Sequence, residues 1–178
     1  MPRMLGLLRG VNLGATRKVP MADLREAMLA DGFRGVATHL QSGNVVFECE
    51  DTPVDAGLWL ERLIRERFGL DVPVLVREPS DVRRVLEANR LRDVACDLSR
   101  YLVAFLSEAP AAEKLRAFDP AEFHPDAFAV GEREIYLWYP NGVHVSRLTV
   151  PLLERRLDLV ATARNWNTLS RLLGMLEA

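Results

Sequence analysis

Two short polar segments carry the residue types with which proteins hold anions. The first contains Arg9, Asn12 and Lys18, and the second is Gln41-Ser42-Gly43-Asn44. Cationic side chains supply charge, while amides and hydroxyls supply directional hydrogen bonds to the oxygens of a phosphate or carboxylate. These residues therefore favour a site for a small anionic ligand, such as a nucleotide or a phosphorylated metabolite.

The surrounding sequence predicts the elements that position the two segments. Short apolar runs predict strands, and apolar residues at intervals of three and four predict helices. The predicted elements are a strand over 3–9, a helix that begins at Pro20 and ends at Gly32, strands over 36–40 and 45–48, a helix with the apolar stripe Leu60, Leu63, Ile64 and Phe68 that ends at Gly69, and a strand over 72–76.

This order of strands and helices predicts the split βαβ arrangement of a ferredoxin-like sandwich. In such a sheet the first and third strands are antiparallel neighbours. The loop over 9–12 and the turn over 41–44 are therefore expected to meet at one edge of the sheet. The first helix begins beside them, and the N–H groups at a helix N-terminus favour anions.

The rest of the sequence predicts a second, similar set of elements. We expect an α+β protein of two ferredoxin-like (α/β plait) halves packed together, covering residues 1–78 and 79–178, the second with extra helices. The elements predicted for the second half are a helix from Pro79, a strand over 101–106, a helix over 110–118, a loop over 119–126, a hairpin of 128–130 and 135–139, a helix with Leu152, Leu153 and Leu157, a less clear strand over 159–163, and a helix capped by Asn165 or Asn167.

The polar segments also have a purely structural interpretation. Asn and Ser in turns commonly bond to their own backbone, and a glycine such as Gly43 can serve only to allow an unusual φ angle. Arg9 could simply pair with an acid such as Glu48. A binding function is thus one of two open explanations for these residues.

Catalysis and assembly are further hypotheses. Arg9 or Arg164 could stabilise negative charge that develops in a reaction. Beside Arg164, Asn165 is either a helix cap or a second ligand contact. No His, Asp or Glu lies within the motif loops to act as a base, which favours binding over catalysis. A homodimer formed through a sheet edge or a helix face is the third possibility.

Composition argues against several classes of protein. The 178 residues are 49% hydrophobic and 27% charged, with a net charge of −2, which is unlike a disordered chain or one that coats nucleic acid. No run approaches the roughly 18 apolar residues that span a bilayer. Cys49 and Cys96 lack metal spacing, and no targeting segment is evident, so we expect a soluble cytoplasmic protein with free thiols.

Other motifs that could bind cofactors, metals or nucleic acids are weak. The His and Cys residues lack zinc spacing, and Gly10 and Gly14 are not followed by the lysine ending of a P-loop, so neither metal nor cofactor is predicted. The aromatic stretch over 136–139 lacks the basic and glycine residues of an RNA-binding motif. We interpret it as a core strand, which makes nucleic-acid binding an unfavoured hypothesis.

Four segments together resemble a known family. They are Leu8-Arg9-Gly10-Val11-Asn12-Leu13-Gly14, Val19-Pro20-Met21-Ala22-Asp23-Leu24-Arg25, Gln41-Ser42-Gly43-Asn44-Val45-Val46-Phe47 and Ala161-Thr162-Ala163-Arg164-Asn165-Trp166-Asn167-Thr168. In this combination the sequence resembles the DUF1697 family, a family of unknown function. The resemblance implies a small bacterial protein of two α/β-plait halves. It also singles out the two polar loops, together with Arg164 and Asn165, as candidate site residues.

Overall fold

The computed structural model describes residues 1–178 and divides into two compact units. Unit 1 comprises Met1–Arg83 and Leu172–Ala178, and unit 2 comprises Arg84–Arg171. Helices α3 (Pro79–Ala88) and α6 (Trp166–Glu177) therefore contribute residues to both units. The expected boundary between residues 78 and 79 falls at the start of α3, whereas the first observed boundary along the chain falls within that helix, between Arg83 and Arg84.

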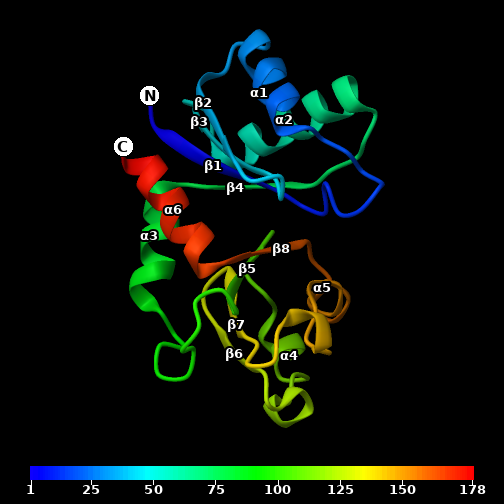
Figure 1. The fold of residues 1–178 in the computed structure, drawn as a ribbon, viewed down its shortest axis with the longest axis vertical. Coiled ribbons are helices and arrows are strands. Elements are labelled where there is room, and N and C mark those ends of the chain that lie inside the picture. Colours follow the sequence, from blue (N-terminus) through cyan, green and yellow to red (C-terminus); the bar gives the residue numbers. More distant parts are fainter. The chain divides into compact units, whose positions relative to one another are not determined.

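Unit 1 is built on a four-stranded antiparallel sheet with strand order β2-β3-β1-β4. Helices α1 and α2 lie on the same face of this sheet (Figure 1). The elements follow the predicted order, with ends that differ by a few residues. They are β1 (Arg3–Leu8), α1 (Met21–Ala30), β2 (Arg34–His39), β3 (Asn44–Glu48), α2 (Pro53–Phe68) and β4 (Val74–Arg77).

Local sequence explains where the two helices of unit 1 begin and end. Thr52 caps α2 by accepting a hydrogen bond from the N–H of Asp55, and Gly69 ends it in the left-handed conformation at φ 67°. The predicted start of α1 was off by one residue, because Pro20 precedes the helix rather than forming its first position. No side chain caps α1. The apolar stripes of both helices pack on the sheet, where Leu24, Met28, Leu60, Leu63 and Ile64 share one buried cluster with Phe47 of β3.

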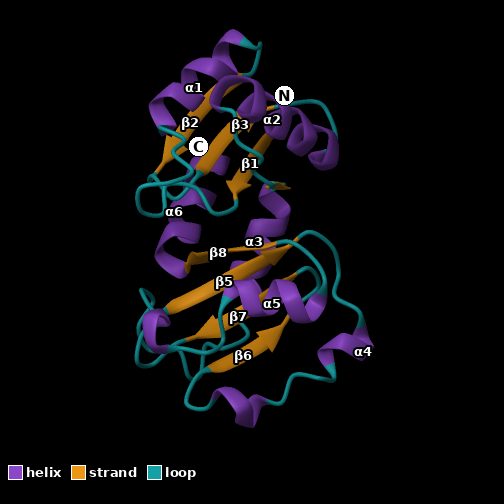
Figure 2. Ribbon diagram, turned by 90° about the vertical axis from the view of Figure 1, so that its right-hand side faces the viewer, coloured by secondary structure: helices purple, strands orange, loops and turns teal.

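Unit 2 contains a second four-stranded antiparallel sheet, with strand order β6-β7-β5-β8. Helix α5 packs on one face of this sheet (Figure 2), where its leucines enter a buried cluster. The elements between α3 and α6 are β5 (Tyr101–Leu106), α4 (Ala112–Leu115), the 3-10 turn η1 (Pro120–Phe123), β6 (Ala127–Val130), β7 (Glu134–Trp138), the 3-10 turn η2 (Val143–Val145), α5 (Val150–Leu157) and β8 (Ala161–Asn165).

Two predicted elements of unit 2 are corrected by the structure. The helix expected over 110–118 is only the single turn α4, which contains no buried residue and so gains little from packing. The last strand forms but runs over Ala161–Asn165, because Asp158 ends α5 in the left-handed conformation at φ 55°. Within the expected loop over 119–126, Asp119 caps η1 through the N–H of Ala121.

The aromatic stretch of β7 is part of the core, as predicted. The Tyr136 hydroxyl donates to the carbonyl of Val85 at 2.9 Å, and burial raises the pKa of Tyr136 to about 12. On the same unit, the rings of Tyr101 and Trp166 stack with centroids 4.5 Å apart. These rings are buried, and the Tyr101 and Tyr136 hydroxyls are hydrogen-bonded within the protein, so the rings offer no exposed platform for stacking nucleic-acid bases.

A buried acid in unit 2 is held by an arginine from α3. Both guanidinium nitrogens of Arg84 contact the Glu134 carboxylate, at 2.7 and 3.3 Å. Burial acts to raise the pKa of Glu134, but the Arg84 hydrogen bonds and the N–H groups of Glu132 and Arg133 outweigh it, so this pKa is lowered. The pair fastens α3 to the hairpin between β6 and β7.

No helix of the structure combines the length and apolarity needed to cross a membrane. Both cysteines are free thiols, with Cys49 buried and Cys96 exposed.

Candidate functional site

The two polar loops of unit 1 meet, as the topology predicts, and Asn12 joins them. Its side-chain nitrogen donates to the carbonyl of Gln41 at 2.7 Å and to the carbonyl of Val19 at 2.8 Å. Its side-chain oxygen accepts from the N–H of Val19 at 2.9 Å. One carboxamide thus closes the loop over 9–19 and ties it to the turn over 40–43. We call these two segments the loop junction.

The backbone of the loop junction is held in unusual conformations. Asn12, Arg17 and Leu40 have φ angles of 56°, 54° and 60°, three of the five non-glycine residues with positive φ in the chain. Such angles cost on the order of 1 kcal/mol or more for a residue with a side chain, and they tend to cluster at functional sites. Arg17 offsets part of this cost by donating to the carbonyls of Gly10 at 3.0 Å and Asp71 at 2.8 Å.

Gly43 is required by a close approach of the two loops. Its carbonyl accepts from the N–H of Leu8 at 2.9 Å, and its φ is 93°. A Cβ at this position would lie 2.7 Å from Cβ of Leu8 and 2.9 Å from Cγ2 of Val11. The turn can therefore rest directly on the end of β1 only with glycine here.

Asn44 is fully buried and has a structural role at the start of β3. Its side-chain nitrogen donates to the carbonyl of His39 at 2.8 Å and to Oγ of Ser42 at 3.1 Å. These bonds close the turn between β2 and β3. Asn12 and Asn44 were expected to contact a ligand, but their side-chain amides instead form hydrogen bonds that hold the loops together.

The remaining polar residues of the loop junction are accessible to solvent. Lys18, Gln41 and Ser42 are exposed, and Arg9 is partly exposed. Asn12 binds the backbone of Gln41 itself and the backbone of Val19, the residue that directly follows Lys18. Two exposed leucines, Leu13 (71% exposed) and Leu40 (55% exposed), belong to the same loops.

Arg164 and Asn165 belong to β8 of unit 2. Arg164 is buried, and its Nη1 donates to Oγ1 of Thr162 at 2.7 Å and to the carbonyl of Ala163 at 2.8 Å. Burial lowers the pKa of Arg164 to about 10, so its guanidinium stays charged at neutral pH. The side-chain oxygen of Asn165 accepts from the N–H of Thr168 at 2.9 Å, which makes Asn165 the cap of α6 rather than Asn167.

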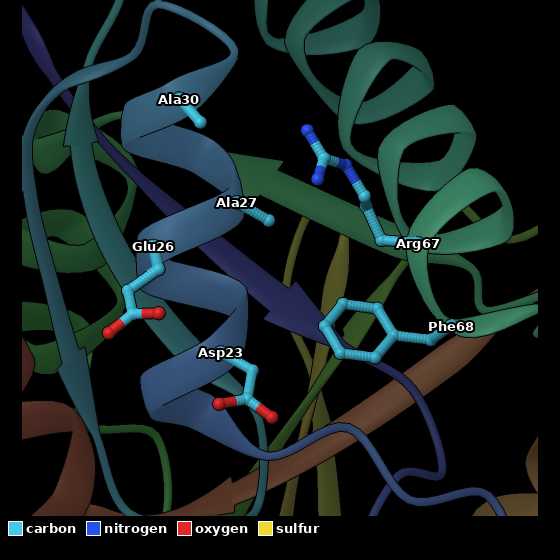
Figure 3. Close-up of a pocket in the computed structure, with 6 residues that line it drawn as sticks. All are labelled: Asp23, Glu26, Ala27, Ala30, Arg67 and Phe68. Atoms are coloured by element: carbon cyan, nitrogen blue, oxygen red, sulfur yellow. The ribbon is translucent and has the colours of Figure 1, made fainter.

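A second feature of unit 1, which the sequence reasoning missed, is a groove between α1 and the end of α2. Its volume is about 440 Å³, and its lining residues are Asp23, Glu26, Ala27, Ala30, Arg67 and Phe68. Figure 3 shows Arg67 and the Phe68 ring projecting from α2 toward Ala27 and Ala30 of α1. The sequence signal that could have found this groove is the pair of acids Asp23 and Glu26, three residues apart on one predicted helix. No group of three or more His, Cys, Asp or Glu side chains is arranged to hold a metal ion.

The fold and the loop junction define a two-unit α+β protein with two four-stranded antiparallel sheets. The chain belongs to the DUF1697 family, whose model, described as "Protein of unknown function (DUF1697)", matches residues 1–136. The match includes the whole loop junction and ends before the segment over 161–168.

One solved structure has a similar fold over nearly the whole chain. It is the conserved bacterial protein SP0830 from Streptococcus pneumoniae, with a TM-score of 0.76, 21% sequence identity and 98% of each chain covered. At 21% identity this similarity shows the fold alone. No curated protein matches the chain.

Proposed function

We propose that this protein binds a small anionic ligand, such as a nucleotide or a phosphorylated metabolite, at the loop junction. In this proposal Lys18 and Arg9 supply positive charge, and Gln41 and Ser42 supply hydrogen bonds. The observation that carries the proposal is the clamp formed by the Asn12 carboxamide, which binds the backbone of both loops at once.

The clamp supports binding because it reduces the cost of ordering the ligand contacts. Lys18 and Gln41 extend from backbone that is already held in place, so less conformational entropy is lost when they contact a ligand. The hydrogen bonds of Asn12 and Arg17 hold this shape against the strain of their positive φ angles. Asn12 and Asn44 are positioning residues in this proposal, and the exposed side chains make the contacts.

Helix α1 adds a weaker contribution to the same site. No side chain caps its first turn, so its N–H groups favour an anion. Asp23 in that turn carries a negative charge that partly satisfies the helix dipole. The charge of Lys18 is therefore the larger attraction for the ligand, and its substitution is the more sensitive test.

The test is a thermal-shift and titration series with inorganic phosphate, pyrophosphate, adenosine 5′-monophosphate and glucose 6-phosphate. A ligand that binds only the folded protein stabilises it by RT ln(1 + [L]/Kd), so Tm rises with the logarithm of ligand concentration once this exceeds Kd. Replacing Lys18 with alanine is expected to weaken binding about fivefold, the effect of one solvent-exposed charge pair. Arg116→Ala is the matched control, because Arg116 is an exposed cation of unit 2 and removes the same unit of charge.

Two outcomes would overturn the proposal. Melting curves that do not change with any of the four anions would show that the loop junction has no such ligand. Equal loss of affinity in Lys18→Ala and Arg116→Ala would show that binding depends on overall charge and not on the junction.

We propose three further properties. Each half has the strand order of a ferredoxin-like unit, with β2-β3-β1-β4 in unit 1 and β6-β7-β5-β8 in unit 2, which supports the α/β-plait assignment. Two free cysteines fit a reducing compartment such as the cytoplasm. Edge strands β2 and β6 could pair two copies of the chain, and light scattering that shows a monomer at all concentrations would exclude that dimer.

A further inference from the structure

We propose that the groove between α1 and α2 is a second binding site, selective for a basic amino acid. The inference does not depend on the loop junction, because the groove uses different residues. Its volume of about 440 Å³ lies within the range of small-molecule sites, roughly 300 to 1,000 Å³.

The apolar part of the groove fits the aliphatic portion of such a ligand. The partly buried ring of Phe68 and the side chains of Ala27 and Ala30 face one another across it (Figure 3). The two alanines leave space that larger side chains on α1 would fill. A chain of a few methylene groups lying on the Phe68 ring would bury apolar surface, and a cation near that ring would also be attracted to its face.

The charged part of the groove determines which ligand fits. Asp23 on α1 contributes one negative charge, Glu26 contributes a second on the side of α1 that faces away from Arg67, and Arg67 on α2 contributes one positive charge (Figure 3). The complementary ligand has two cationic groups, one anionic group and an apolar middle. L-Arginine and L-lysine have this composition, with an α-ammonium, a side-chain cation and a carboxylate.

These three charged residues have no hydrogen bond or ion pair elsewhere in the structure. On the same helix α2, by contrast, Arg65 pairs with Asp71 and Arg62 lies 4.0 Å from Glu66. A ligand would therefore gain the contacts of the groove without breaking existing pairs. The carboxylate of the ligand would face Arg67, where a guanidinium can bind it with two parallel hydrogen bonds.

The experiment titrates the full chain with L-arginine and with agmatine, which is arginine without its carboxylate, at low ionic strength. Backbone amide shifts in the NMR spectrum locate the site, and their concentration dependence measures Kd. We expect shifts confined to the residues of α1 and the end of α2, saturating in the millimolar range or below. Agmatine is expected to bind about fivefold more weakly, since it lacks one charge contact.

Two groove variants and two matched controls separate the contributions. Glu26→Gln is expected to weaken both ligands about fivefold. Arg67→Gln is expected to weaken arginine but not agmatine, so that the difference between the ligands disappears. The controls Glu66→Gln and Arg62→Gln change the same charges on α2 outside the groove, and should leave both affinities unchanged.

All four substitutions are at exposed positions, so the variants are expected to fold, and circular dichroism verifies this. Absence of shifts in α1 and α2 at about 10 mM arginine, near the weakest specific affinities, would overturn the inference. It would also be overturned if the controls weakened binding as much as Glu26→Gln. If agmatine bound as well as arginine to the wild-type chain, the selectivity for an amino acid would be refuted. Loss of anion binding at the loop junction would leave these results unaffected, so the two proposals fail separately.

Discussion

The clamp at Asn12 gives the sharpest quantitative prediction. Asn12→Ala removes three hydrogen bonds of 2.7, 2.8 and 2.9 Å. Each neutral hydrogen bond contributes about 1 kcal/mol net, and water can replace part of the outermost one, so their loss costs about 2 kcal/mol. An alanine with φ near 56° adds about 1 kcal/mol, for a total of about 3 kcal/mol.

The assay is urea unfolding of the wild-type chain and of two variants, Asn12→Ala and Asn12→Gly. Glycine also removes the hydrogen bonds but adopts a positive φ without strain, so its variant should be less destabilised by about 1 kcal/mol. Amide hydrogen exchange provides a local measurement. The Val19 N–H, which donates to Asn12, should lose protection in both variants, since opening the loop exposes it to solvent.

A specific result would refute this reasoning. If both variants unfolded within about 0.5 kcal/mol of the wild type, with Val19 still protected, the side chain of Asn12 would not be what holds the loops together. A loss of stability in Asn12→Ala alone would instead assign the effect to backbone strain and not to the hydrogen bonds.

Three other experiments test separate parts of the structure. Gly43→Ala places a Cβ 2.7 Å from that of Leu8 and should lower the free energy of unfolding, measured in urea, by about 2 kcal/mol or more. Gly14→Ala is the control, because Gly14 also has a positive φ but a Cβ there would have no atom within 4 Å; it should lower the free energy of unfolding by about 1 kcal/mol. Asn165→Ala removes the cap of α6 and should lower the free energy of unfolding by about 1 kcal/mol, measured in the same way. Because the pKa of Glu134 is lowered in the folded protein, its charged form contributes fully to stability at neutral pH. This contribution is lost as the pH falls below about 4.5 and through the folded-state pKa. The free energy of unfolding of Glu134→Gln should therefore depend less on pH in acid than that of the wild type.

Much of the fold follows from local sequence signals. Strand β5 was predicted with its observed ends, and Gly69 was identified as the end of α2, because a continuous apolar run and a left-handed glycine are local features. The helix over 110–118 was overestimated for the converse reason. Its residues favour a helix, but only packing determines how far a helix extends, and α4 buries no side chain.

The candidate site was predicted in part. Strand topology was sufficient to bring the loop with Asn12 beside the turn with Gln41, and the hydrogen bond from the Asn12 side chain to the Gln41 carbonyl joins them. The roles of individual residues were not predictable. Whether an amide faces a ligand or a neighbouring carbonyl depends on side-chain directions, as in Asn44, whose amide closes its own turn. The groove beside Phe68 depends on the spacing of two helices, which periodicity does not determine.

Unit 1 is assembled from two stretches of sequence that are far apart. Arg3 in β1 donates to the carbonyls of Met175 and Ala178, and Arg83 pairs with Glu177. During synthesis on the ribosome, the first 83 residues are therefore exposed for some time without their last partner. The four strands of the N-terminal sheet are translated first, but unit 1 is completed only when Leu172–Ala178 has been synthesised, so a truncated product is expected to be a target for chaperones and proteases.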